Sequence, residues 1–228
     1  MEILSNHWPL FVLIAFFVAV WFWIRFSQKQ ASLRQSRLAE LAKRKSLQFN
    51  PDPTYQLVPA MQYFSLFQLG VERIVSNAFS GTVASDDRTF TVHAGDFLYK
   101  AASGKNRQTM ATEHSFVLVS LPIGVNGAVS VRLEKLVDKV AGTFGLPDIN
   151  FESEEFSRKF YITGEDKRFA YALFDPRMIR WLLETPPPDF IVSGGWLLVF
   201  GPIWSEREFE RSLDWAGDFV RHCPRNPK

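Results

Sequence analysis

The chain has 228 residues, of which 46% are hydrophobic and 15% aromatic, and its 26 basic side chains nearly balance 24 acidic ones. Disordered chains are poor in aromatic residues, and disulfide-stapled chains need more than the single cysteine present, so both classes are excluded. The composition leaves room for one apolar membrane span rather than several.

The first expected element is a transmembrane helix over residues 8–26. No charged side chain occurs between Trp8 and Ile24, and these 17 residues correspond to roughly 25 Å of helix. The hydrocarbon core of a bilayer is about 30 Å thick, so the run is close to the length of a span. Trp8 stands at one end and Trp21 and Trp23 at the other, where indole rings serve as membrane-interface anchors.

Two alternatives to a membrane span fit the sequence less well. A secretory signal peptide begins with Lys or Arg and ends in small residues. Here residues 1–7, expected to be a short N-terminal tail, contain no Lys and no Arg. The apolar run ends in the bulky residues WFWIRF rather than in small ones. A helix buried in a soluble core rarely runs so long without a polar face. The sequence therefore predicts an integral, single-pass membrane protein whose first partner is the lipid bilayer.

The basic residues that follow the span predict its orientation, because cytoplasmic flanks carry an excess of Lys and Arg. We expect the N-terminus outside and the large C-terminal part in the cytoplasm. The lone Cys223 suits a reducing compartment. The residues expected at the cytoplasmic membrane surface are Arg25, Lys29, Arg34, Arg37, Lys43, Arg44 and Lys45.

Residues 27–50 are expected to continue the span as a basic juxtamembrane helical stalk, because they are rich in good helix formers. The motif Asn-Pro-Asp-Pro at residues 50–53 is expected to end that helix. Residues 25–45 hold seven basic and one acidic side chain, whereas residues 46–228 hold 19 basic and 22 acidic ones. The near-neutral total thus hides a basic collar followed by a mildly acidic domain.

The globular part is expected to be one domain over residues 54–223. Alternating apolar and polar residues indicate strands in its first half, and Gly and Pro mark the ends of short helices. In chain order we expect a helix at 62–69, strands at 82–84 and 89–100, a polar hairpin loop at 103–113, strands at 116–121 and 128–133, and a helix at 136–144.

Helix-capping residues and a hairpin signal organise the second half. Asp166 and Asp175 stand at expected helix starts, and Gly194-Gly195 is typical of a two-residue hairpin turn. We expect helices at 153–156, 166–174 and 176–184, strands at 160–163, 190–193 and 196–200, and a short tail at 224–228.

The last expected helix begins at a capping box formed by Ser205 and Glu208. Helical spacing places Phe209, Leu213, Ala216, Val220 and Cys223 on one face, which should pack on the sheet. The predicted fold class is α+β: an N-terminal transmembrane helix and stalk, then one domain of mainly antiparallel sheet with helices packed on it.

The search for chemistry finds no catalytic signature and no zinc-ligand spacing, so no cofactor and no metal are expected. His222 and Cys223 are neighbours and would diverge on a helix. If the protein is an enzyme, the candidate groups are His93 or His114 with Asp96, or the cluster Glu165/Asp166. An ordinary structural role for each is favoured. The globular part has no basic excess, so no nucleic-acid partner is expected.

The stalk end LAELAKRKSLQF, the segments FSLFQLG and NAFSG, and the stretch LPDINFESEEFSRKFYITGEDKRFAYALFDPRMIRWL carry a resemblance. Together they are similar to a family of uncharacterised bacterial single-pass membrane-anchored proteins with a cytoplasmic domain of unknown function. The resemblance implies the bacterial inner membrane and the same architecture. Its motifs are loose aromatic and polar patterns, and it implies no catalytic residue.

Three functions therefore compete. We favour a membrane-tethered cytoplasmic interaction or accessory module with an unidentified protein partner. The alternatives are a membrane-face enzyme of unrecognised type and a module whose basic stalk senses anionic lipid. The 17 Phe, 5 Tyr and 4 Trp beyond the span are expected to form a core. Trp181 and Trp204 are the candidates for exposed partner-docking aromatics.

Overall fold

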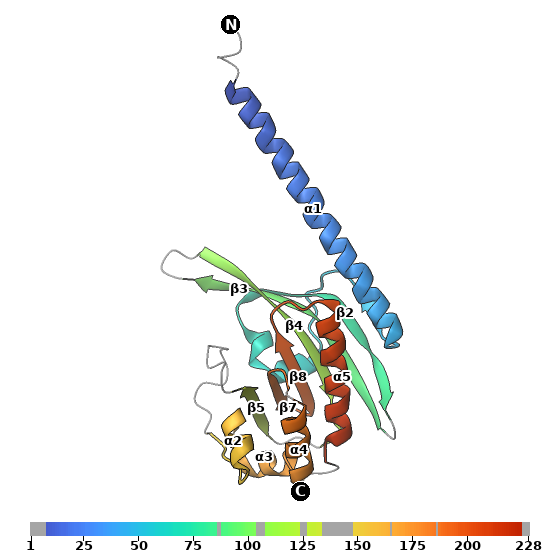
Figure 1. The fold of residues 1–228 in the computed structure, drawn as a ribbon, viewed down its shortest axis with the longest axis vertical. Helices are drawn as coiled ribbons and strands as arrows, with labels where there is room; N and C mark the ends of the chain where they lie inside the picture. The colour runs from blue at the N-terminus through green and yellow to red at the C-terminus, as the bar shows by residue number, and fades with distance from the viewer. Residues whose placement is uncertain are drawn as a thin grey trace.

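A computed structural model describes residues 8–85, 88–103, 108–123, 127–133, 148–164, 166–185 and 187–224. Its first element, α1 (Trp8–Arg44), is a helix of 37 residues whose N-terminal part projects away from the rest of the molecule (Figure 1). Among the described helices only α1 is long and apolar enough to cross a membrane, and its most apolar window has no buried residue. One N-terminal apolar helix of this kind fits a membrane anchor.

The remainder is built on one eight-stranded sheet in the order β1-β2-β3-β4-β8-β7-β5-β6, in which every described pairing is antiparallel. The predicted α+β class, with a mainly antiparallel sheet and helices packed on it, is confirmed. The strands are β1 (Gln48–Asn50), β2 (Val71–Ser85), β3 (Arg88–Ser103), β4 (Gln108–Ser120), β5 (Ala128–Leu133), β6 (Phe160–Gly164), β7 (Phe190–Ser193) and β8 (Trp196–Gly201).

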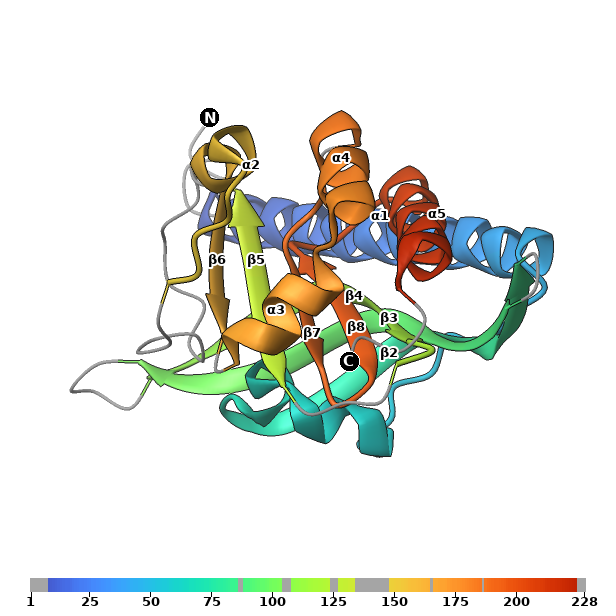
Figure 2. The same ribbon diagram turned by 90° about the horizontal axis from the view of Figure 1, so that it is seen from below.

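Each face of the sheet has its own covering layer (Figure 2). The end of α1 and the helices packed with it share a large hydrophobic core with one face. Two short 3₁₀ helices cover part of the other face and form a second core with it. These covering elements are α2 (Glu154–Lys159), α3 (Lys167–Leu173), α4 (Pro176–Glu184) and α5 (Glu206–His222) on the first face, and η1 (Pro59–Tyr63) and η2 (Ser65–Gln68) on the second.

The first helix ends at Arg44, six residues before the expected end of the stalk, and residues 48–50 are strand β1 rather than helix. The stop is a Schellman motif. Ser46 adopts a left-handed conformation with φ of 56°, and the Leu47 and Ser46 amides donate to the carbonyls of Ala42 and Lys43. The left-handed position after a helix end is usually occupied by glycine, so a serine at this position did not indicate the end of the helix in the sequence.

Two further expectations are corrected in the first half of the sheet. The helix expected at 62–69 is the pair η1 and η2, separated by Phe64 in an extended conformation. The loop expected at 103–113 is in part strand, because β3 and β4 stay in register out to the pair Ser103 and Gln108. Residues 103–113 are rich in polar side chains, so the sequence lacks the alternation that indicates a strand.

The second half follows the expectations closely. The side chains of Ser153, Asp166 and Asp175 cap α2, α3 and α4, and Ser205 and Glu208 form the capping box of α5. Gly194 and Gly195 form the β7–β8 turn with φ of 57° and 79°. The expected helix at 136–144 and the tails at 1–7 and 225–228 lie outside the described residues. The buried face of α5 consists of Phe209, Ser212, Trp215, Ala216, Phe219 and Val220.

Candidate functional site: the junction of anchor helix and domain

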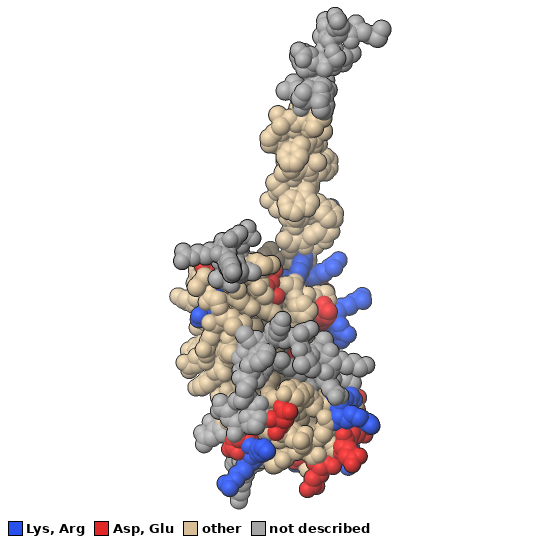
Figure 3. Space-filling view, turned by 90° about the vertical axis from the view of Figure 1, so that its left-hand side faces the viewer, with Lys and Arg blue, Asp and Glu red and all other residues tan. Residues whose placement is uncertain are grey.

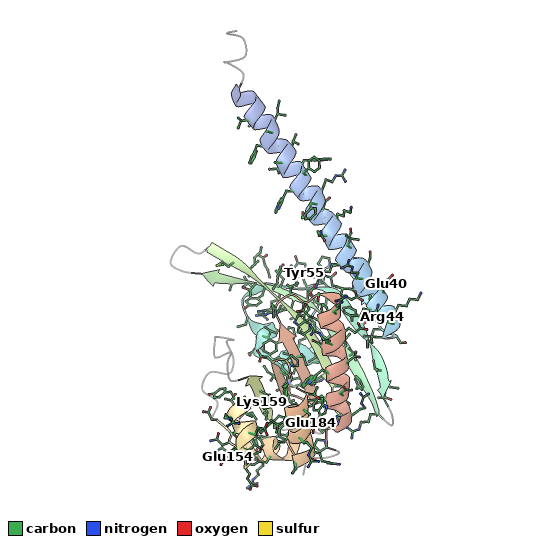
Figure 4. The ribbon with its side chains drawn as sticks, viewed as in Figure 1. Glu40, Arg44, Tyr55, Glu154, Lys159 and Glu184 are labelled. Atoms are coloured by element: carbon green, nitrogen blue, oxygen red, sulfur yellow. The ribbon has the colours of Figure 1, made fainter. Side chains whose placement is uncertain are left out.

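The last quarter of α1 is part of the domain core. Leu38, Leu41 and Ala42 are almost fully buried, and this part of α1 contacts α5, β1 and β2. A helix that reaches the sheet in this way is a docked element rather than a free stalk. Figure 4 shows Glu40 and Arg44 on the same docked part of α1.

Arg34 joins the anchor helix to the centre of the sheet. Its guanidinium forms a two-pronged ion pair with the Asp96 carboxylate on β3, with N–O distances of 2.6 and 3.0 Å. The same guanidinium donates to the carbonyl of Trp204, in the connection between β8 and α5, at 2.9 Å. Paired hydrogen bonds between arginine and carboxylate fix orientation as well as distance.

Asp96 is buried and accepts two more hydrogen bonds. The Asn77 amide on β2 donates at 2.8 Å and the Ser115 hydroxyl on β4 donates at 2.6 Å. The Ser115 oxygen in turn accepts from the Trp204 amide at 2.9 Å. A buried carboxylate is costly unless it is hydrogen-bonded, and these donors satisfy both oxygens of Asp96. The network therefore ties α1, three strands and the start of α5 together.

The backbone around Asp96 is shaped to build this network. Asn77 sits at an irregularity between Ser76 and Phe79 in the pairing of β2 with β3, with φ of 49°. Opposite it, a Cβ at Gly95 would lie 2.9 Å from the Ser76 carbonyl oxygen. The bulge turns the Asn77 amide toward Asp96, and glycine allows the close approach of the two strands.

A second set of ion pairs lies further along α1. The Arg44 guanidinium contacts the carboxylates of Glu206 and Glu210, and the Lys45 ammonium contacts Asp214, all on α5. These acidic groups raise the pKa of Arg44. The pairs are largely exposed, so they orient the two helices more than they stabilise them.

Of the seven basic residues expected at the membrane surface, four contact another side chain and three lie on exposed positions. Arg34, Arg44 and Lys45 bind carboxylates of the domain, and the Arg25 guanidinium lies 5.5 Å from the centre of the Trp21 ring. The remaining three, Lys29, Arg37 and Lys43, lie on exposed positions of α1. Basic side chains gather where the apolar rod meets the domain (Figure 3). Trp21 and Trp23 are exposed on α1. Trp8 is the first residue of that helix.

A cleft opens beside the junction, between α5 and the chain that enters β7 and leaves β8. Its volume is about 620 Å³. Trp204 and Trp215 form part of its wall, and Trp215 Nε1 is buried without a hydrogen-bond acceptor among the described residues. Because Arg34 holds the Trp204 carbonyl, docking of the anchor helix also fixes one wall of the cleft. Its charged lining residues are Asp189, Glu208, Arg211, Asp214 and Asp218.

The two candidate histidines face away from Asp96. His93 and His114 lie on the strand face that is covered by η1 and η2, since side chains alternate along a strand and Asp96 shares the opposite face with Ser115. Burial lowers the pKa of both imidazoles. His114 stacks on Tyr99, and His93 contacts Trp196. The sheet thus separates the groups that an acid–base pair would require.

The other sequence candidates have structural roles. Asp166 caps α3, while Glu165 lies outside the described residues. No cluster that could hold a metal ion occurs among the described residues. Burial raises the pKa of Cys223 to about 12. Trp204, a candidate for an exposed docking aromatic, is 6% exposed and belongs to the core. Trp181 is half-buried and stacks between Trp215 and His222.

The central pair of the site, Arg34 and Asp96, was not recognised as a pair from the sequence. One signal was present: Asp96 continues the face of Val92 and Ala94, both buried, and so places a carboxylate where an apolar residue belongs. A charged residue in that position requires a partner. The sequence did not identify that partner, because Arg34 lies 62 residues away.

Comparison with protein-family models and with curated proteins finds no match. A solved structure with a similar fold is the crystal structure of the mycobacterial trehalose monomycolate transport factor A, TtfA, with a TM-score of 0.52 and 14% sequence identity. The similarity covers 83% of this chain and 96% of that one. At this identity the likeness concerns the fold.

Proposed function

We propose that this protein is a membrane-anchored accessory factor whose cytoplasmic domain serves a transport process at the bacterial inner membrane. The observation that carries the proposal is the docking of the anchor helix. An unbroken helix leads from the apolar segment into the core and is locked there by Arg34 and Asp96. Such a joint holds the domain at a defined place beside the bilayer, which suits a factor that acts on a membrane partner.

The fold comparison supports the same class of function. TtfA is named as a trehalose monomycolate transport factor, and the likeness in fold covers 83% of this chain. The basic collar supports a cytoplasmic domain through the positive-inside rule. Among the described residues, the sheet separates His93 and His114 from Asp96.

In-cell photo-cross-linking of the full chain tests the proposal. A photoreactive residue at Arg211, on the rim of the cleft, is expected to give a discrete adduct with a membrane protein. The matched control is the same residue at Arg177, whose side chain is 81% exposed on α4. No adduct at Arg211, or the same adducts at both positions, would contradict an accessory role through this cleft.

Orientation has its own test. Reporter fusions at the two ends of the full chain should place the C-terminal reporter in the cytoplasm and the N-terminal one outside. The reverse result would overturn the cytoplasmic assignment while leaving the anchor intact.

A further inference from the structure

The domain begins very close to the end of the apolar segment. Arg34, the first residue of α1 that is bonded to the domain, lies ten residues after Ile24. Ten residues of helix correspond to about 15 Å. The headgroup layer on each side of a bilayer is about 5–8 Å thick. The upper edge of the domain is therefore within a few side-chain lengths of the headgroups.

The domain also extends back toward the bilayer beside α1. The outer ends of β3 and β4 and the connection between β8 and α5 lie at the end of the domain from which α1 emerges (Figure 1). Tyr55 lies at the same end (Figure 4). We call this end the membrane-proximal rim and define it by Tyr55, Val71, Met110 and Ile203.

The rim residues are large, apolar and exposed. Tyr55 is 72% exposed, Met110 62%, Val71 60% and Ile203 41%. Val71 pairs with Lys100 and Met110 with Ala101, so both lie at the outer end of three adjacent strands. Exposed apolar residues that are gathered at one end of a molecule mark an interaction surface.

Two basic side chains described at this end of the sheet are bonded within the chain. Lys100 pairs with Glu72, and the Arg73 guanidinium donates to the carbonyls of Gln68 and Gly70. Among the described residues of this surface, the groups available for contact are apolar side chains and a tyrosine ring, which favours the interface between water and hydrocarbon.

We infer that the membrane-proximal rim is a second membrane-contact surface, at which Tyr55, Val71, Met110 and Ile203 enter the lipid headgroup layer beside α1. The inference rests on the membrane anchor of the proposed function. It commits to the bilayer as the occupant because the anchor brings that surface to the rim. Apolar contact of this kind does not require anionic lipid, unlike attraction through the basic collar.

Depth measurements by electron paramagnetic resonance test the inference on the full chain in nanodiscs. Spin labels are attached at Tyr55→Cys and Met110→Cys, with Phe17→Cys in α1 as the lipid reference and Tyr171→Cys as the aqueous control. Tyr171 is 48% exposed, on α3, outside the rim. Cys223 is 1% exposed and stays unlabelled. The ratio of accessibility to oxygen over accessibility to a water-soluble nickel chelate reports lipid contact.

At positions 55 and 110 we expect a ratio several-fold above that at position 171, equal in phosphatidylcholine and in mixtures with phosphatidylglycerol. Water-like ratios at both rim positions, with lipid contact at position 17, would overturn the inference and leave the anchor intact. Contact that requires phosphatidylglycerol would also overturn it, in favour of the basic collar. Protection from both reagents would indicate a protein partner instead. Water-like ratios at position 17 would remove the anchor and the proposed function together.

Discussion

The two halves of α1 follow opposite rules. In the first half, large apolar residues such as Phe16 and Phe22 are more than 60% exposed, whereas in the second half Leu38 and Leu41 are fully buried and the surrounding residues are charged. The first half matches a lipid environment and the second matches a protein interior with an aqueous edge. One continuous helix therefore carries both kinds of surface, and the change in burial marks where the domain begins.

The largest expected effect on stability comes from removing the Asp96 carboxylate, which binds Arg34 in the second half of α1. Asp96→Ala leaves Arg34 without its ion-pair partner, and loss of one partner of a buried pair costs about 3–5 kcal/mol. Urea unfolding, followed by tryptophan fluorescence, measures the change. Asp52→Ala at an exposed position is the control. Equal stability of the two variants would show that the network does not hold the domain.

Truncation of one apolar side chain in each half of α1 compares the two halves directly. Leu41→Ala removes a fully buried side chain and should cost about 2–5 kcal/mol of domain stability. Phe17→Ala removes a larger side chain from the exposed half and should leave domain stability unchanged in detergent micelles. A similar loss for both variants would mean that the first half also packs on the domain.

The point at which the docked half ends can be sharpened with one substitution. Ser46 holds a left-handed conformation that costs a residue with a Cβ roughly 1–2 kcal/mol, part of which glycine recovers. Ser46→Gly is therefore expected to stabilise the domain by about 0.5–1 kcal/mol in the same unfolding assay. Destabilisation would show that the serine side chain stabilises the turn.

The smallest expected effect is a pH dependence of stability that arises from the sheet face opposite α1, where His93 and His114 lie. Burial lowers the pKa of His93 and His114 in the folded chain, so the unfolded chain binds more protons below about pH 6.5. Stability should be complete above pH 7 and fall as the pH drops toward 5.5. The double variant His93→Gln, His114→Gln should flatten this dependence between pH 5.5 and 7.5. An unchanged slope would assign it to other groups, of which the exposed His222 is one.

Local sequence signals predicted much of this fold. Asp166, Asp175 and the Ser205 capping box mark helix starts through side chains that act within three residues. The Gly194-Gly195 turn and the apolar run of α1 are equally local. Each depends on neighbours in the chain, so the sequence alone contains the information.

The candidate site depends on contacts between distant residues. Arg34 belongs to a run of basic residues whose members look alike, and only the folded sheet distinguishes it by bringing Asp96 within 2.6 Å. The outer parts of β3 and β4 have polar residues on both faces, so they lacked the alternation that indicates a strand. Which face of the sheet each histidine occupies likewise follows from register.

In the proposed membrane-anchored arrangement, α1 passes directly from lipid into the domain core, so the helix and the domain tilt as one body. Its helical length is about 55 Å, and no described kink or loop separates the apolar part from Arg34. A helix changes its tilt with the thickness of the surrounding bilayer. Because the joint is locked, a change in tilt rotates the sheet and its cleft by the same angle. In that arrangement, the thickness of the bilayer sets how the domain is oriented toward its surroundings.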